Sequence, residues 1–190
     1  METDIAEGGH ILTLGDTQTI LELNRRLEPH KTQEKFLSFE KLLDIFREYD
    51  ILVGAAHPYR EGGHIPELPE EQLRRLDFFD LNGKDIAENR EQTEKLTYAL
   101  GRRLEKPVIG GSDTHQAVQY GCIHTDFDTE IETIEELHRQ MQLGHYRITV
   151  SERAPFQVKT ASVLKRALKE IHALGGNYVD VLTGSGEIAG

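Results

Sequence analysis

Three side chains suited to metal binding follow two apolar segments of the sequence. His57 comes directly after ILVGAA, and Asp113 and His115 come after PVIGG. In parallel α/β folds, ligands bind beyond the carboxyl ends of the strands. A turn histidine or a capping aspartate would explain each residue alone, but not why they recur at equivalent positions. Imidazoles and a carboxylate without a cysteine suit Zn²⁺, Mn²⁺ or Fe, so we expect a divalent metal site.

The spacing of Asp113 and His115 adds a geometric expectation. Alternate residues of an extended backbone point the same way, so both side chains would address one centre. The glycines that precede them, Gly110 and Gly111, would let the backbone approach closely without a side-chain clash.

Apolar strand-like runs alternate with amphipathic segments along the chain. Asp16 and Thr133 are expected N-caps, and Gly101 is expected to end a long helix. This alternation predicts an α/β domain with a largely parallel sheet, either a barrel or open. The expected strands are 10–15, 50–58, 77–81, 106–113 and 146–151, and the expected helices are 16–27, 38–48, 69–76, 83–100, 133–144 and a basic amphipathic helix in the tail, followed by a strand-like segment at 177–182.

Composition limits the class of protein. The chain has 190 residues, which fits one domain, and a formal net charge of −11, which argues against a nucleic-acid partner. No apolar run approaches the about 20 residues that span a bilayer, so no membrane partner is expected. The single cysteine, Cys122, rules out an internal disulfide and fits a cytoplasmic location.

Five motifs resemble those of the PHP (polymerase and histidinol phosphatase) superfamily. GAAHPYR, FDLNG, IGGSDTH, YGCIHTDF and TIEELHRQMQLG occur in that family's order, and the resemblance covers roughly residues 1–150. It implies a distorted β/α barrel that holds two or three divalent metals. Many members of the family hydrolyse phosphate esters.

The resemblance also implies roles for individual residues. His57 matches the histidine of the Ala-His-Pro motif, a metal ligand, and Asp113 and His115 match the last two ligands. His10 resembles the histidine that opens a middle strand. Glu2 resembles a carboxylate that often bridges metals.

The chain also departs from the family pattern. Members usually start with a His-x-His strand and carry a Thr-Asp-His motif, and neither occurs here. We therefore expect an incomplete barrel without its first strands, with fewer metals and a free edge open to self-association. The expected organisation is a PHP-like domain at 1–150 and an extension at 151–190 that ends in a flexible tail.

The leading hypothesis is a metal-dependent phosphoesterase acting on a small phosphorylated substrate by metal-activated water. Arg60 would contact the substrate phosphate through its planar fork, although a solvated loop arginine is an equal alternative. Asp113 and His115 would take part in catalysis, with His115 near the leaving group. The missing ligands favour a second hypothesis, a non-catalytic module that contacts a partner. A third is a metal-dependent hydrolase of another bond.

Overall fold

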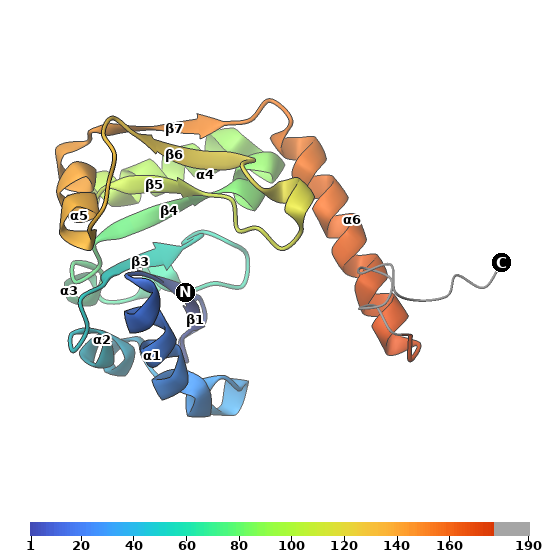
Figure 1. The fold of residues 1–190 in the computed structure, drawn as a ribbon, viewed down its shortest axis with the longest axis horizontal. Helices are drawn as coiled ribbons and strands as arrows, with labels where there is room; N and C mark the ends of the chain where they lie inside the picture. The colour runs from blue at the N-terminus through green and yellow to red at the C-terminus, as the bar shows by residue number, and fades with distance from the viewer. Residues whose placement is uncertain (177–190) are drawn as a thin grey trace.

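The strands form an open mixed sheet and a separate two-stranded ribbon. The computed structural model describes residues 1–176 (Figure 1). The sheet has the order β1-β2-β3-β4-β5, with antiparallel β1/β2 and β2/β3 pairs and parallel β3/β4 and β4/β5 pairs. Its strands are β1 (Glu2–Asp4), β2 (His10–Leu14), β3 (Leu52–Ala56), β4 (Phe78–Asn82) and β5 (Val108–Gly111), and the antiparallel ribbon is β6 (Ile123–Phe127) with β7 (Tyr146–Val150).

The α/β class is confirmed, but a closed barrel is not found among the described residues. The backbone ladder stops at β5, because a side chain occupies its next hydrogen-bonding position. The Gly110 amide donates to Oγ1 of Thr125 (2.8 Å), and the same hydroxyl donates to the Gly110 carbonyl oxygen (3.2 Å). The sheet and the ribbon are therefore joined by side-chain hydroxyls, those of Thr125, Ser112 and Tyr146, instead of continuous strand pairing.

The helices begin largely where the expected caps lie. Asp16 accepts from the amides of Gln18 and Thr19, and Thr133 accepts from the Glu136 amide. Gly101 does not end its helix: a Cβ there would lie 2.8 Å from Val108, so this glycine allows close packing against β5 instead. The helices are α1 (Thr17–Leu27), α2 (Phe39–Phe46), α3 (Glu70–Leu73), α4 (Gly83–Leu104), α5 (Ile134–Leu143) and α6 (Ala154–Ala173).

Side-chain alternation divides the sheet into two unlike faces. One face is apolar and belongs to the main core, with Ile11, Val53, Ala55, Phe79 and Leu81. On the other face an apolar half, with Leu52 and Phe78, packs against Met141 of α5. Because strand side chains alternate with a period of two, the rest of that face carries the polar side chains. These are Glu2, Asp4, His10, Asp80 and Asn82.

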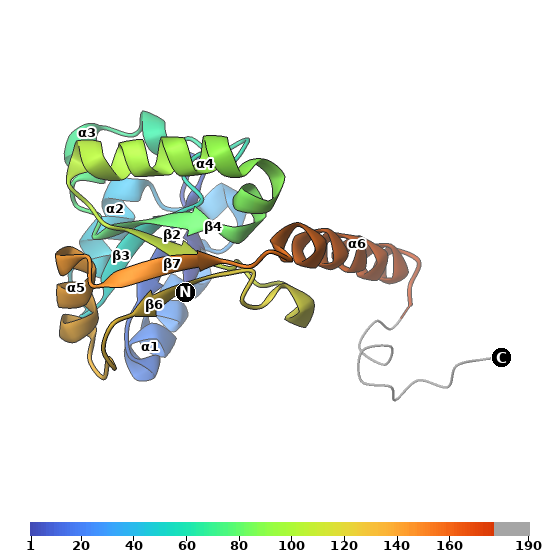
Figure 2. The same cartoon turned by 90° about the horizontal axis from the view of Figure 1, so that it is seen from above.

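The last described helix leaves the body of the domain. The first turns of α6 are packed, with Ala154, Val158 and Ala161 buried, and its later turns extend past the body (Figures 1 and 2). No helix within residues 1–176 is both long enough and apolar enough to cross a membrane. The expected strand-like segment at 177–182 and the expected flexible tail lie outside the described residues.

Asp80 is a carboxyl group in the interior of the sheet. It is 4% exposed and accepts from Nδ2 of Asn82 (3.1 Å) and from the His57 amide (3.3 Å). Burial disfavours the charged form and raises the pKa of Asp80 to about 7. Stability contributed by the neutral carboxyl is therefore lost as pH rises from the usual carboxyl range through about 7.

We expect Asp80→Asn, measured with a chelator present, to gain thermal stability over wild type as pH rises. The two proteins should melt alike near pH 5, and the variant should melt at least about 3 °C higher at pH 8. The reason is that the amide keeps the volume of the side chain and never has to ionise. Asp44→Asn on the exposed face of α2 is the control, with no such trend. A difference in melting temperature that does not change with pH would contradict the assignment.

Candidate metal centre and its pocket

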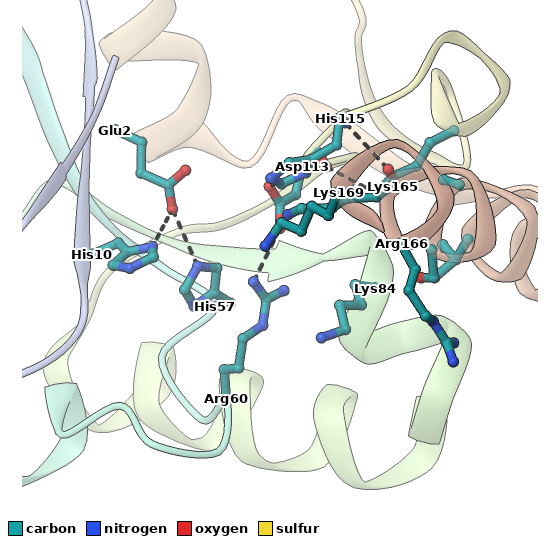
Figure 3. A pocket seen from close by; sticks show the side chains of 14 residues that line it. Glu2, His10, His57, Arg60, Lys84, Asp113, His115, Lys165, Arg166 and Lys169 are labelled. Carbon is teal, nitrogen blue, oxygen red and sulfur yellow. Dashed lines mark hydrogen bonds and ion pairs between the residues drawn. The ribbon is translucent and has the colours of Figure 1, made fainter. Parts of the chain in front are cut away.

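Glu2, His10 and His57 bring three ligand atoms together. One potential ligand atom from each lies within 4.8 Å of the others. Nδ1 of His10 lies 2.6 Å from Oε1 of Glu2, and Nε2 of His57 lies 3.2 Å from the same oxygen (Figure 3). The imidazole rings meet edge to face, with their centroids 4.8 Å apart. Zinc–ligand distances are about 2.0–2.2 Å, so small side-chain rotations would bring all three donors within reach of one ion.

Strand direction explains why His10 belongs to this cluster although it begins its strand. β2 runs antiparallel to β3, and His10 pairs with Ala56, the last residue of β3. The start of β2 therefore lies at the same sheet edge as the ends of β3, β4 and β5. Glu2 pairs with Leu12 on the neighbouring strand, and its longer side chain reaches back toward His10.

The charges in this cluster reinforce one another. The hydrogen bonds from His10 and His57 hold the pKa of Glu2 well below its usual range. The same bond to Glu2 raises the pKa of His10. A carboxylate not identified from the sequence also takes part: Oδ1 of Asp4 lies 3.1 Å from Nε2 of His10. Carboxylates that bind the second ring nitrogen of a ligating histidine fix its orientation, so Asp4 is suited to that role.

Asp113 and His115 lie in a loop beyond β5 and not on an extended strand. β5 ends at Gly111, and Asp113 has a φ of 49°, so the expectation that strand alternation aligns the two side chains is wrong. They are brought together by the loop itself, where Nδ1 of His115 lies 3.0 Å from the Asp113 carbonyl oxygen. Gln119 holds this loop by donating to the carbonyls of Ser112 and Asp113, both at 2.9 Å.

The expectation that glycines allow close backbone approach is confirmed at Gly111. A Cβ on this residue would lie 2.8 Å from Oδ1 of Asp80. Any larger residue would therefore displace either β5 or the buried carboxyl group beneath the site.

Arg60 connects the cluster to the loop beyond β5. Its guanidinium donates from Nε to Asp85 (3.0 Å), from Nη1 to Asp113 (3.0 Å) and from Nη2 to Asn82 (2.6 Å). A guanidinium has five N–H donors, so these contacts leave two for another acceptor. Arg60 is thus a fixed cation, not a solvated loop arginine.

Two of the predicted site residues have a left-handed backbone. His57 has a φ of 28° and Asp113 a φ of 49°, directly after β3 and just beyond β5. Residues with a side chain rarely adopt this region, and it costs energy that the surrounding structure must offset. At both positions the turn directs a polar side chain toward one pocket.

That pocket has a volume of about 430 Å³ and gathers all six predicted site residues. Figure 3 shows Arg60 beside His57, with α6 on the side of the pocket away from Glu2. Asp113 and His115 share this pocket but are not part of the three-residue cluster around Glu2. The lining consists of Glu2, His10, His57, Arg60, Lys84, Asp113, His115, Gln119, Val158, Ala161, Ser162, Lys165, Arg166 and Lys169.

Several residues that line or support the site were not identified from the sequence, although some of them had a signal. Asp80 and Asn82 lie within FDLNG at the end of a buried strand, where the rule that located His57 also applies. The basic residues of α6 were visible as an amphipathic pattern. For Asp4 and Gln119 no local pattern exists, because their roles come from contacts made by the folded chain.

Two solved structures have a similar fold. PsfC from Pseudomonas syringae PB-5123 matches with a TM-score of 0.66 and 17% identity, over 88% of this chain and 64% of that one. The lesion-specific endonuclease PfuEndoQ from Pyrococcus furiosus matches with a TM-score of 0.52 and 18% identity, over 77% of this chain and 39% of that one. The chain thus spans less than two thirds of each protein that it matches. No curated protein matches it.

The similarity to an endonuclease overturns the expectation that nucleic acid is excluded as a partner. That expectation was wrong because it rested on the net charge of −11, which sums over the whole chain. A local field depends on which charges line a site. Here Arg60, Lys84 and the cations of α6 line one pocket in an otherwise acidic protein.

The family comparison concerns a shorter segment. Residues 96–146, from the middle of α4 to the start of β7, match the family described as PHP-associated. This segment includes Asp113, His115 and the β6 strand that carries the YGCIHTDF motif. This match over about a quarter of the chain supports the resemblance found in the sequence, and the two solved structures share its fold.

Proposed function

We propose that this chain carries a metal-dependent phosphoesterase site, with Glu2, His10 and His57 as metal ligands. The observation that carries the proposal is one pocket lined by both a three-donor cluster and a fixed guanidinium. Metal ligands beside a guanidinium with two remaining N–H donors suit phosphoryl hydrolysis, since the ion would activate water and the guanidinium would bind phosphoryl oxygens. An endonuclease cleaves phosphate diesters, so its similar fold supports this class of reaction.

The chemistry of the donors fits a divalent ion such as Zn²⁺, Mn²⁺ or Fe²⁺. Two imidazoles and a carboxylate leave coordination positions for water and substrate. When bound, such an ion lowers the pKa of a water ligand and polarises a phosphoryl oxygen. Glu2, in contact with both imidazoles, would orient them around the ion, and Asp4 would hold the His10 ring from its other nitrogen.

Asp113 and His115 have separate roles in this proposal. Asp113 would add a fourth ligand to the set. Its Oδ2 atom is paired with Arg60 in this structure. His115 is 47% exposed in its side chain, and its Nδ1 is engaged by the Asp113 carbonyl. Because a carbonyl oxygen only accepts, Nδ1 carries a hydrogen, and the ring would give a proton from Nε2 to the leaving oxygen only when both nitrogens are protonated.

Arg60 would bind the phosphoryl group of the substrate. Asp85, Asp113 and Asn82 hold its guanidinium plane in place, which lowers the entropy lost when the remaining donors engage an anion. A planar pair of donors also selects a phosphoryl group over a single negative charge.

The ligand assignment predicts a specific loss of metal affinity. After metal removal and titration with Zn²⁺ or Mn²⁺ in a calorimeter, wild type should bind at least one ion. Glu2→Gln and His57→Ala should each weaken binding by at least about 100-fold, because they remove a direct donor. His64→Ala is the matched control, since this exposed histidine pairs with Glu67 outside the pocket. Wild type that binds no ion, or variants that bind as wild type does, would refute the assignment.

The role of Arg60 predicts a kinetic loss. Metal-loaded wild type should hydrolyse p-nitrophenyl phosphate or its diester, and Arg60→Lys should lower kcat/KM by about 10- to 100-fold while metal affinity stays the same. The exposed Arg74→Lys, on the pair with Glu70, should change neither quantity. If metal-loaded wild type hydrolyses no ester, the chain is a non-catalytic module and the proposal fails.

A further inference from the structure

One face of α6 changes character along its length. The residues that line the pocket recur every three or four positions, so they lie on one side of the helix. In its first half this side is mostly apolar, with Val158 and Ala161 buried against the body. In its second half it carries Lys165, Arg166 and Lys169, which we call the α6 cations.

Some basic side chains of residues 1–176 are paired with carboxylates, and the α6 cations are among those that are not. Arg26, Arg74 and Arg90 each form an ion pair with a glutamate at 2.7–2.8 Å. Within residues 1–176, no carboxylate forms an ion pair with Lys165, Arg166 or Lys169. Like charges within one turn of a helix repel one another, so this grouping costs stability in the absence of an anion.

The position of the α6 cations relative to Arg60 suggests what they bind. Both groups line the same pocket, with Arg60 beside the Glu2 cluster and the α6 cations on a helix that lies on the side away from Glu2 (Figure 3). Lys84, at the start of α4, also lines the pocket. One phosphoryl group engaged by Arg60 does not account for three further cations that another element adds to the same pocket.

We propose that the α6 cations bind a second anionic group of the substrate, in addition to the phosphoryl group at Arg60. The inference rests on the proposed phosphoesterase site and specifies its substrate class: a phosphate ester with at least two anionic groups. The second anion is either the neighbouring phosphate of a nucleic-acid strand or another phosphate on a small molecule. Both present the same chemistry to Lys165, Arg166 and Lys169.

The test measures binding by the full chain with and without Mn²⁺. The probes are inorganic phosphate, adenosine 3′,5′-bisphosphate and a ten-nucleotide single-stranded DNA. The variant combines Lys165→Gln, Arg166→Gln and Lys169→Gln, and its melting temperature is compared with that of wild type. Lys159→Gln is the matched control, because Lys159 is an exposed cation of the same helix that does not line the pocket.

We expect the triple variant to bind the bisphosphate at least about 10-fold more weakly, with inorganic phosphate changed less than about threefold. A much larger loss for DNA, with its salt dependence reduced by about two units of slope, would identify the strand as the source. Equal losses for DNA and bisphosphate would identify the small molecule.

Two results overturn the inference. One is a bisphosphate affinity that the triple variant leaves unchanged. The other is an equal loss for inorganic phosphate and bisphosphate, which would mean a general field and not a second site. Failure of the metal centre gives a different result, loss of Mn²⁺ binding in wild type, and the comparison without Mn²⁺ still decides the role of the α6 cations.

Discussion

The antiparallel pairing of β2 with both β1 and β3 is the constraint on which the candidate centre depends. It places the start of β2 beside the end of β3, so that His10 and His57 meet at one edge. With β2 reversed, His10 would lie about four residues, or about 13 Å, from that edge. The period-two alternation of side chains then puts Glu2, Asp4 and His10 on the same face. The centre is thus a consequence of strand direction combined with side-chain parity.

The electrostatic organisation of the pocket also depends on Arg60, whose charge is paired with carboxylates on two other elements. Arg60 joins the loop after β3 to α4 and to the loop after β5. Burial raises the pKa of Asp80 and so favours its neutral form, which needs no cationic partner. Asn82 and the His57 amide donate hydrogen bonds to it. A group held on several sides loses little entropy when it binds a ligand, which is the basis of preorganisation. The α6 cations have no carboxylate partner within residues 1–176, and two of them, Arg166 and Lys169, are exposed.

Much of this arrangement could be predicted from the sequence. The ends of β3 and β5 were visible because continuous apolar runs stop at polar residues, and Asp16 and Thr133 were visible as caps because capping is local. Strand direction, the open sheet and the loop conformation of Asp113 could not be predicted in this way. They depend on contacts between distant segments, such as the one from Thr125 to Gly110. The expectation that nucleic acid is not a partner failed for a similar reason. The net charge of the whole chain does not say where the charged side chains lie.

His57 and Asp113 have a left-handed backbone, and at these positions the demands of stability and of the proposed function conflict. Glycine is the residue that best tolerates this backbone region, and at either position it would relieve strain in the fold. It would also remove an imidazole or a carboxylate from the pocket. Selection for thermal robustness alone would therefore favour sequences with glycine at these two turns and without the pocket's polar groups. At these two turns, the residue that best suits the backbone differs from the residue that supplies a polar group to the pocket.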